Sequence, residues 1–75
     1  MAPTHVRNAI RRLRFEHGEM TQGELAERIG VTRQTVNAIE QGKYSPTLEA
    51  AFRIAQVFGR KLEEVFQYGP GEGQG

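Results

Sequence analysis

Hydrophobic residues recur along the chain at alternating steps of three and four, the spacing that gathers them on one face of an α-helix. The first such stripe contains Val6, Ile10, Leu13 and His17, and Gly18 ends it. Neither the alternating pattern of a strand nor an internal repeat is visible in the sequence. The pattern therefore predicts an all-α chain.

The second predicted helix has two independent signals at its start. Thr21 and Glu24 have the spacing of a capping box, in which each side chain bonds a backbone N–H of the first turn. Met20 and Leu25 occupy the positions of a hydrophobic staple around the same boundary. The helix is short, because Gly30 can adopt the left-handed conformation that ends helices. Its expected buried residues are Leu25, Ala26 and Ile29.

The third predicted helix is polar on most of its surface. Thr32 can cap it, Val36 and Ile39 are its inward positions with Glu40 beside them, and Gly42 ends it. The other faces combine planar hydrogen-bond donors and acceptors without negative charge. Their residues are Arg33, Gln34, Thr35, Asn37, Ala38 and Gln41.

Two more helices are expected toward the C-terminus. Ser45-Pro46-Thr47 is typical of a loop in which Thr47 or Ser45 caps the following helix. The buried stripe of that helix is predicted to be Leu48, Ala51, Ile54, Ala55 and Phe58. A last short helix over residues 61–66 adds Leu62, Val65 and Phe66 to the core. After Tyr68 the chain is rich in glycine, so we expect one domain over residues 1–68 and a flexible tail over 69–75.

Composition argues against several classes of function. The 75 residues contain no cysteine, and His5 and His17 have no partner at a metal-ligand spacing, so we expect no metal site and no cofactor. No apolar run reaches the roughly 18 residues that cross a bilayer, which favours a cytoplasmic protein without a membrane partner. Neither a nucleophile with an oriented base nor a small-molecule site is evident, so we expect no enzymatic activity.

Charge is distributed unevenly although the formal net charge is only +1. The first predicted helix carries four arginines against the single acid Glu16; they are Arg7, Arg11, Arg12 and Arg14. A solvated helix face and a face toward nucleic acid both fit this pattern.

The segment from Gln22 to Gly42 has the spacing of a helix-turn-helix. Ala26 is small where the two helices cross, Gly30 lies in the turn, and apolar residues fill the angle between the helices. The sequence resembles the Xre/Cro family of phage-repressor-like regulators over residues 6–66. The segments that carry the resemblance are Ile10-Arg11-Arg12-Leu13-Arg14, Thr21 to Ala26, Gly30 to Val36, Ile39-Glu40-Gln41-Gly42-Lys43, Pro46-Thr47-Leu48 and Leu62 to Phe66.

The resemblance implies a compact five-helix bundle of the lambda-repressor-like type that binds double-stranded DNA. The recognition helix, about residues 32–42, would enter the major groove. Arg33, Gln34 and Asn37 share one face near its start, where an arginine fork matches guanine and an amide matches adenine. Ala38 could at most touch a thymine methyl group. These four residues are the expected base contacts.

Contacts to the DNA backbone are expected from Gln22, Thr32, Thr35, Gln41, Lys43 and Tyr44. The amide of Gln22 and the adjacent helix N-terminus can hold a phosphate oxygen. Thr32 and Thr35 have an alternative role as caps or surface hydroxyls. Lys43 would add affinity and salt dependence without sequence information.

A structural ion pair is implied between Arg14, at the end of the first helix, and Glu40, at the end of the recognition helix. An acid–base pair of an enzyme is the alternative. We prefer the structural role, because arginine is not deprotonated near neutral pH. The pair is therefore expected to stabilise the fold without reading sequence.

Dimerisation is expected because three reading side chains cover few base pairs, whereas a homodimer reads two half-sites about 34 Å apart in a palindromic operator. The preferred interface is the region 61–68, and the candidate residues are Phe52, Leu62, Phe66 and Tyr68. The same residues could instead cover the small core. Repressor and activator roles both fit, and an antitoxin-like protein-interaction module that also binds DNA is the alternative function.

Overall fold

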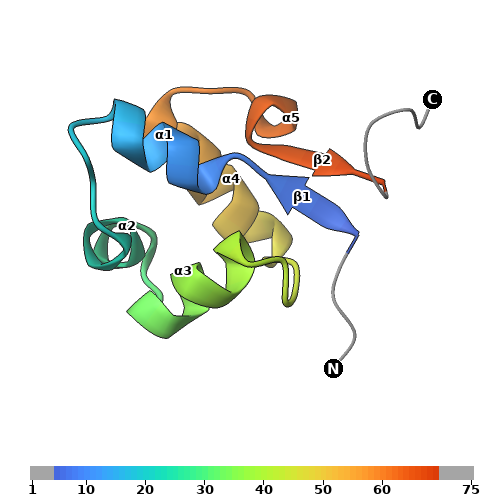
Figure 1. The fold of residues 1–75 in the computed structure, drawn as a ribbon, viewed down its shortest axis with the longest axis horizontal. Coiled ribbons are helices and arrows are strands. Elements are labelled where there is room, and N and C mark those ends of the chain that lie inside the picture. The colour runs from blue at the N-terminus through green and yellow to red at the C-terminus, as the bar shows by residue number, and fades with distance from the viewer. Residues whose placement is uncertain (1–4, 70–75) are drawn as a thin grey trace.

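The computed structural model describes residues 5–69, so residues 70–75 of the expected tail lie outside the described residues. Five helices and two short strands follow one another along this part of the chain (Figure 1). In order they are β1 (Val6–Asn8), α1 (Ile10–Glu16), α2 (Gln22–Ile29), α3 (Arg33–Glu40), α4 (Leu48–Phe58), α5 (Leu62–Val65) and β2 (Phe66–Tyr68). None of these helices is both long and apolar enough to cross a membrane.

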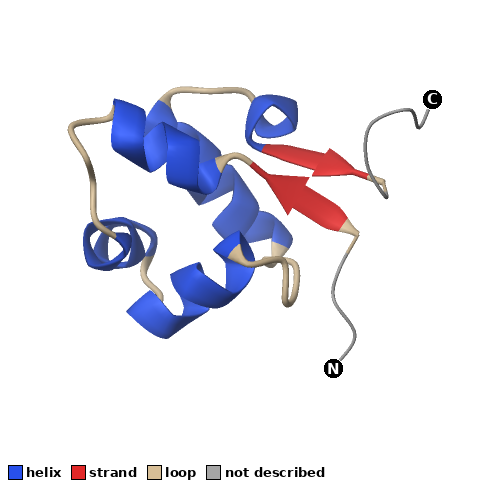
Figure 2. Cartoon of the chain, in the orientation of Figure 1, coloured by secondary structure: helices blue, strands red, loops and turns tan. Residues whose placement is uncertain are grey.

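A two-stranded antiparallel sheet joins the two ends of the domain (Figure 2). Val6 pairs with Tyr68, and Asn8 pairs with Phe66. The all-α prediction is thus only approximately right, since residues assigned to the first and last helices belong to strands. Strands of three residues are too short to show an alternating pattern, and these two depend on each other across the whole domain.

The hydrophobic core lies where α1, α2, α3, α4 and α5 meet. Its buried members are Ile10, Leu13, Met20, Leu25, Ala26, Ile29, Val36, Ile39, Ile54, Ala55, Phe58 and Val65. Leu48 was expected in this core, but 68% of it is exposed. It is the first residue of α4, and the inward stripe of that helix begins one turn later at Ala51. Leu62 and Phe66 are half-buried, and Phe66 packs against the core edge.

Local signals set the ends of α2 and α3 as expected. Thr21 and Glu24 form the complete capping box, so that prediction is confirmed. Gly30 ends α2 with a φ of 78°, in the left-handed region that other residues rarely adopt. The side chain of Thr32 accepts a hydrogen bond from the backbone N–H of Thr35 and begins α3. Two short helices are therefore joined by a turn without a flexible linker.

Arg14 and Glu40 tie α1 to the end of α3. Arg14 Nε donates to Glu40 Oε2 at 2.6 Å, and Arg14 Nη2 donates to Glu40 Oε1 at 3.1 Å. Arg14 Nη1 also donates to the backbone oxygen of Met20 at 2.7 Å, which holds the loop before α2. The two side chains are only 15% and 8% exposed. This bidentate pair is therefore shielded from water and connects three elements.

Loss of the guanidinium should destabilise the domain strongly. Arg14→Ala leaves the Glu40 carboxylate buried without its charge partner, so we expect a loss on the order of 3 kcal/mol in the free energy of unfolding. Arg12→Ala is the matched control, because the Arg12–Glu16 pair is mostly exposed and worth less than about 1 kcal/mol. Urea denaturation of both variants measures the difference. Equal stabilities would contradict the structural role of Arg14.

The capping box predicts a pH-dependent contribution to stability. The backbone N–H of Thr21, and then its side chain, lower the pKa of the Glu24 carboxyl below its ordinary value. A lowered pKa in the folded state gives stability that is present above the unfolded-state pKa and is lost as the pH falls through the folded-state pKa. Glu24→Gln should therefore be less stable than the parent chain at neutral pH, and the gap should narrow on acidification. Thermal unfolding of both chains between neutral and strongly acidic pH tests this; a constant gap would contradict it.

Candidate nucleic-acid interface

The turn between α2 and α3 leaves one long side of α3 outside the core (Figure 1). Val36 and Ile39 are buried between the helices, with 1% and 2% of their surface exposed. Every residue of α3 before Val36 is exposed or half-buried. The start of this helix is thus the part of α3 that an external partner reaches most easily.

Arg33 and Gln34 occupy this start and are both exposed. Within residues 5–69, neither side chain forms a hydrogen bond or an ion pair, so both can bind a partner. The stem of Arg33 runs past the first turn of α2, where its Cδ lies 3.9 Å from the position that a Cβ on Gly23 would take. Part of the Arg33 stem therefore lies close to α2.

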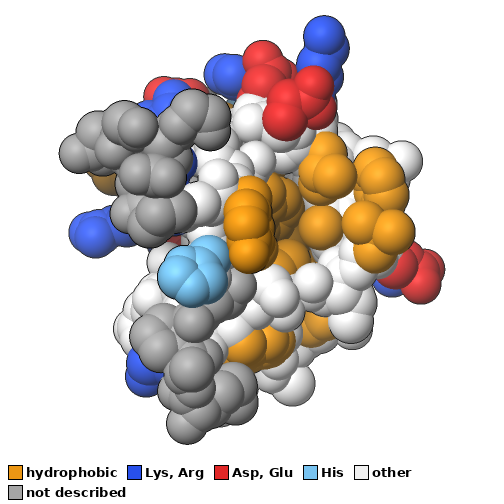
Figure 3. Space-filling view, turned by 90° about the vertical axis from the view of Figure 1, so that its right-hand side faces the viewer, with side chains coloured by type: hydrophobic (Ala, Val, Ile, Leu, Met, Phe, Trp, Pro, Cys, Tyr) orange, Lys and Arg blue, Asp and Glu red, His pale blue; other side chains and the backbone are white. Residues whose placement is uncertain are grey.

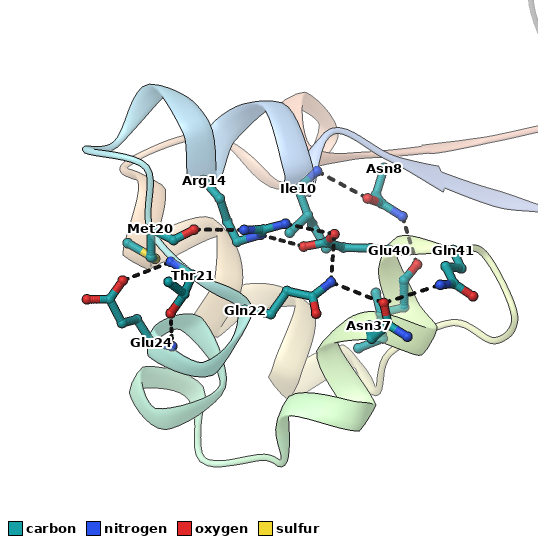
Figure 4. A network of polar contacts seen from close by, with 11 residues as sticks. Asn8, Ile10, Arg14, Met20, Thr21, Gln22, Glu24, Asn37, Glu40 and Gln41 are labelled. Carbon is teal, nitrogen blue, oxygen red and sulfur yellow. Dashed lines mark hydrogen bonds and ion pairs between the residues drawn. The ribbon is translucent and has the colours of Figure 1, made fainter.

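Asn37 belongs to a network of side-chain amides next to the ion pair (Figure 4). Gln22 Nε2 donates to Asn37 Oδ1 at 3.2 Å and to Glu40 Oε1 at 3.1 Å. Gln41 Nε2 donates to the same Asn37 oxygen at 3.2 Å. The two hydrogens of the Gln22 amide are thus used inside the protein, and what it can offer to a phosphate is the first-turn backbone N–H at the start of α2.

The remaining α3 residues have smaller roles in this geometry. The Thr32 hydroxyl caps the helix and lies 3.0 Å from the Thr35 hydroxyl, so both are engaged with each other. Ala38 is half-buried and carries no polar group. The cap role that the sequence left open for Thr32 is therefore the one seen in the structure.

The loop after α3 turns sharply at Gly42, which has a φ of 72°. The backbone N–H groups of Gln41, Gly42 and Lys43 donate to the carbonyls of Asn37, Ile39 and Ala38, respectively. These three donors are therefore not available to a phosphate. The Lys43 side chain is exposed, whereas Tyr44 is half-buried against the core.

Two residues near α3 were not identified from the sequence as site residues. Arg11 lines the same polar hollow as Gln22, Asn37 and Gln41, so α1 adds a positive charge beside the amides. Asn8 Nδ2 donates to the Ile39 carbonyl at 2.9 Å, and its Oδ1 accepts from Ile10 N–H at 3.1 Å. The sequence signal for Asn8 was weak, because it is a single asparagine between Val6 and Ile10 in the segment assigned to the first helix. No group of three metal-ligating side chains occurs in the part of the chain that the structure describes.

Comparisons with known proteins found relatives that match most of the chain. The helix-turn-helix family pattern matches residues 10–65. An uncharacterized HTH-type transcriptional regulator from Methanocaldococcus jannaschii is 48% identical over 63 residues, which are 84% of this chain and 94% of that protein. The antitoxin HipB of Escherichia coli is 36% identical over 55 residues, covering 73% of this chain and 61% of HipB.

The fold also has a match among solved structures. A candidate DNA-binding protein from Bacteroides fragilis superimposes with a TM-score of 0.70 over 83% of this chain and 98% of that chain, at 19% identity. At this identity the match supports the fold alone. The family pattern, by contrast, extends from the start of α1 to the end of α5. The chain therefore belongs to the Xre/Cro-type helix-turn-helix family of transcriptional regulators.

Proposed function

We propose that this chain is a sequence-specific regulator of transcription that binds a palindromic operator as a homodimer, with α3 in the major groove. The observation that carries the proposal is that Arg33 and Gln34 are exposed and have no hydrogen-bond or ion-pair partner within residues 5–69. They lie at the start of α3, which the Arg14–Glu40 ion pair and the core hold in place. An arginine fork matches guanine O6 and N7, and a glutamine amide matches adenine N6 and N7. A rigid support keeps these groups in register with base edges.

Backbone contacts in this proposal surround α3. The start of α2 at Gln22 faces one phosphate, and Lys43 with the Tyr44 hydroxyl faces another beyond the end of α3. Thr35, near the start of α3, and Gln41, just after its end, are the further expected contacts to the DNA backbone. Arg11 adds a further positive charge beside Gln22 and Gln41. These groups determine the affinity and the register of the protein on DNA, and the side chains at the start of α3 determine which base sequence is preferred.

The homodimer is supported by an apolar face outside the DNA-binding surface. Hydrophobic side chains gather on the side of the molecule that carries the two strands (Figure 3). A shallow groove there is lined by Val6, Ser45, Pro46, Leu48, Ala51, Leu62 and Phe66. Leu48 also lines the neighbouring hollow that contains Phe52, and 49% of Phe52 is exposed. A second copy that covers this face would bury apolar surface and carry a second α3 to the next half-site.

A second candidate function is that of an antitoxin that also binds DNA. The similarity to HipB, which is named an antitoxin, is the observation that favours it. In that case a toxin binds the apolar face. Because this alternative also includes DNA binding, the oligomeric state of the isolated chain does not distinguish it from the regulator.

The central experiment selects bound sequences from a random duplex pool and titrates the enriched duplex against a scrambled one at fixed salt. We expect a motif with two symmetric half-sites and a preference for the motif of at least about 10³-fold. Enrichment of no motif, or equal affinity for the two duplexes, would contradict the proposed function.

Exchange of Arg33 should relax sequence preference at one symmetric position in each half-site. Arg33→Ala removes a bidentate contact, so we expect the binding free energy to weaken by about 1–3 kcal/mol for duplexes that carry the preferred base. Duplexes with another base at that position should lose little. Lys43→Ala is the matched control, because loss of a phosphate contact weakens all duplexes similarly and lowers the salt slope by about 1. Binding titrations on single-base operator variants at several salt concentrations separate the two effects. The reverse pattern would contradict the assigned roles.

Exchange of Phe52 should weaken self-association. Phe52→Ser removes an aromatic ring from the apolar face, so we expect the dimer to dissociate more readily and the operator affinity to fall. Phe15→Ser is the matched control, because Phe15 is 70% exposed but lies on α1. Sedimentation measures the association of both variants. A dimer that is weakened by the Phe15 exchange and not by the Phe52 exchange would assign the interface to α1.

A further inference from the structure

The Glu40 carboxylate dictates the orientation of two neighbouring amides. An ionised carboxylate only accepts hydrogen bonds, so the atom of Gln22 that lies 3.1 Å from Glu40 Oε1 must be its amino nitrogen. The second hydrogen of the same nitrogen points to Asn37, 3.2 Å away, so the atom of Asn37 on that side must be its carbonyl oxygen. The charge on Glu40 therefore orients Asn37 through Gln22.

Asn37 has one group left for an external partner. Its Oδ1 receives hydrogen bonds from Gln22 and from Gln41, whereas its Nδ2 donates to no other residue within the described range 5–69. Figure 4 shows this amino group directed away from Gln22 and Gln41. Turning the Asn37 amide over would place its amino group opposite two donors and break both bonds. What Asn37 presents at the surface of α3 is a hydrogen-bond donor.

We infer that Asn37 determines specificity as a donor only, and that it selects guanine or thymine over adenine at the base that it contacts. Guanine presents O6 and N7 in the major groove and thymine presents O4, all of which accept hydrogen bonds. Adenine also presents the N7 acceptor, but its N6 amino group lies beside N7 and repels a second donor, so a group that can only donate gains less from adenine than from guanine or thymine. This inference rests on the proposed function, since it concerns how the same helix reads DNA.

The inference differs from the adenine contact that the sequence suggests for Asn37. A free asparagine amide binds adenine through both of its ends, with the oxygen accepting from N6 and the nitrogen donating to N7. In this chain the oxygen is already bound inside the protein. Gln22 is therefore a positioning residue. The effect of Gln22 on base preference should be separable from its effect on overall affinity.

The test compares base preferences of the parent chain and of Asn37→Ala in the duplex selection. We expect one symmetric base pair to lose its preference in the variant, and the preferred base there to be guanine or thymine. Replacing that base by adenine should weaken the parent complex about tenfold. A preferred adenine, or no position that depends on Asn37, would overturn the inference.

Gln22→Ala tests the positioning role. Without Gln22 the Asn37 amide can turn over, so we expect discrimination against adenine at the same position to fall toward onefold. Gln41→Ala is the matched control, because Gln41 is exposed and its amide is not bound to the carboxylate. The ratio of affinities for the two duplexes within each variant cancels any general loss of binding. Discrimination that is retained in Gln22→Ala, or lost equally in both variants, would overturn the role assigned to Gln22.

A measurement without DNA separates failure of this inference from failure of the proposed function. In the free protein, the side-chain amide hydrogens of Gln22 should exchange with water more slowly than those of Asn37, as seen by NMR, because only the former are bonded internally. Faster exchange at Gln22 than at Asn37 would overturn the assigned orientation. Slow exchange at Gln22 combined with no enriched motif would contradict the proposed function, and the base preference with it.

Discussion

The carboxylate of Glu40 is the group on which the arrangement of the first three helices depends. It receives two hydrogen bonds from Arg14 and one from Gln22, and only 8% of its side chain is exposed. A charge that is withdrawn from water must be compensated by donors at short distance, because its desolvation is otherwise costly. The compensation here comes from α1 and α2, while the carboxylate itself ends α3. One charge that is largely shielded from water thus links three helices.

The hydrophobic core could not set this arrangement alone. Apolar burial is nondirectional, and α3 has only eight residues, too few for a stable helix in isolation. Val36 and Ile39 hold α3 against the core, but hydrogen bonds have direction and define its rotation and end point. Asn8 adds to this control by bonding the carbonyl of Ile39 from the segment before α1. The Arg33 and Gln34 side chains at the start of α3 are exposed and form no such bonds within residues 5–69, which suits a surface that binds a partner.

The two ends of the domain serve a different purpose. β1 and β2 close the chain into one unit, and the sheet lies beside a groove lined by Leu62 and Phe66. Apolar side chains that a small core cannot enclose remain on this face, among them Leu48 and Tyr68. The polar groups around α3 and the apolar groups around the strands come from different elements, so one small fold can support two kinds of contact.

The sequence by itself determined the local features of this protein. The capping box of Thr21 and Glu24 and the turn at Gly30 depend on groups within a few residues. The buried positions of α2 and of α3 follow from helical periodicity. The family resemblance added the pairing of Arg14 with Glu40. Tertiary structure alone decided the rest. The pairing of β1 with β2 and the inward orientation of the Gln22 amide both depend on groups far apart along the chain. Sequence periodicity assigns a residue to a helix face, but the hydrogen-bond partner of an amide on that face depends on which other elements the fold brings next to it.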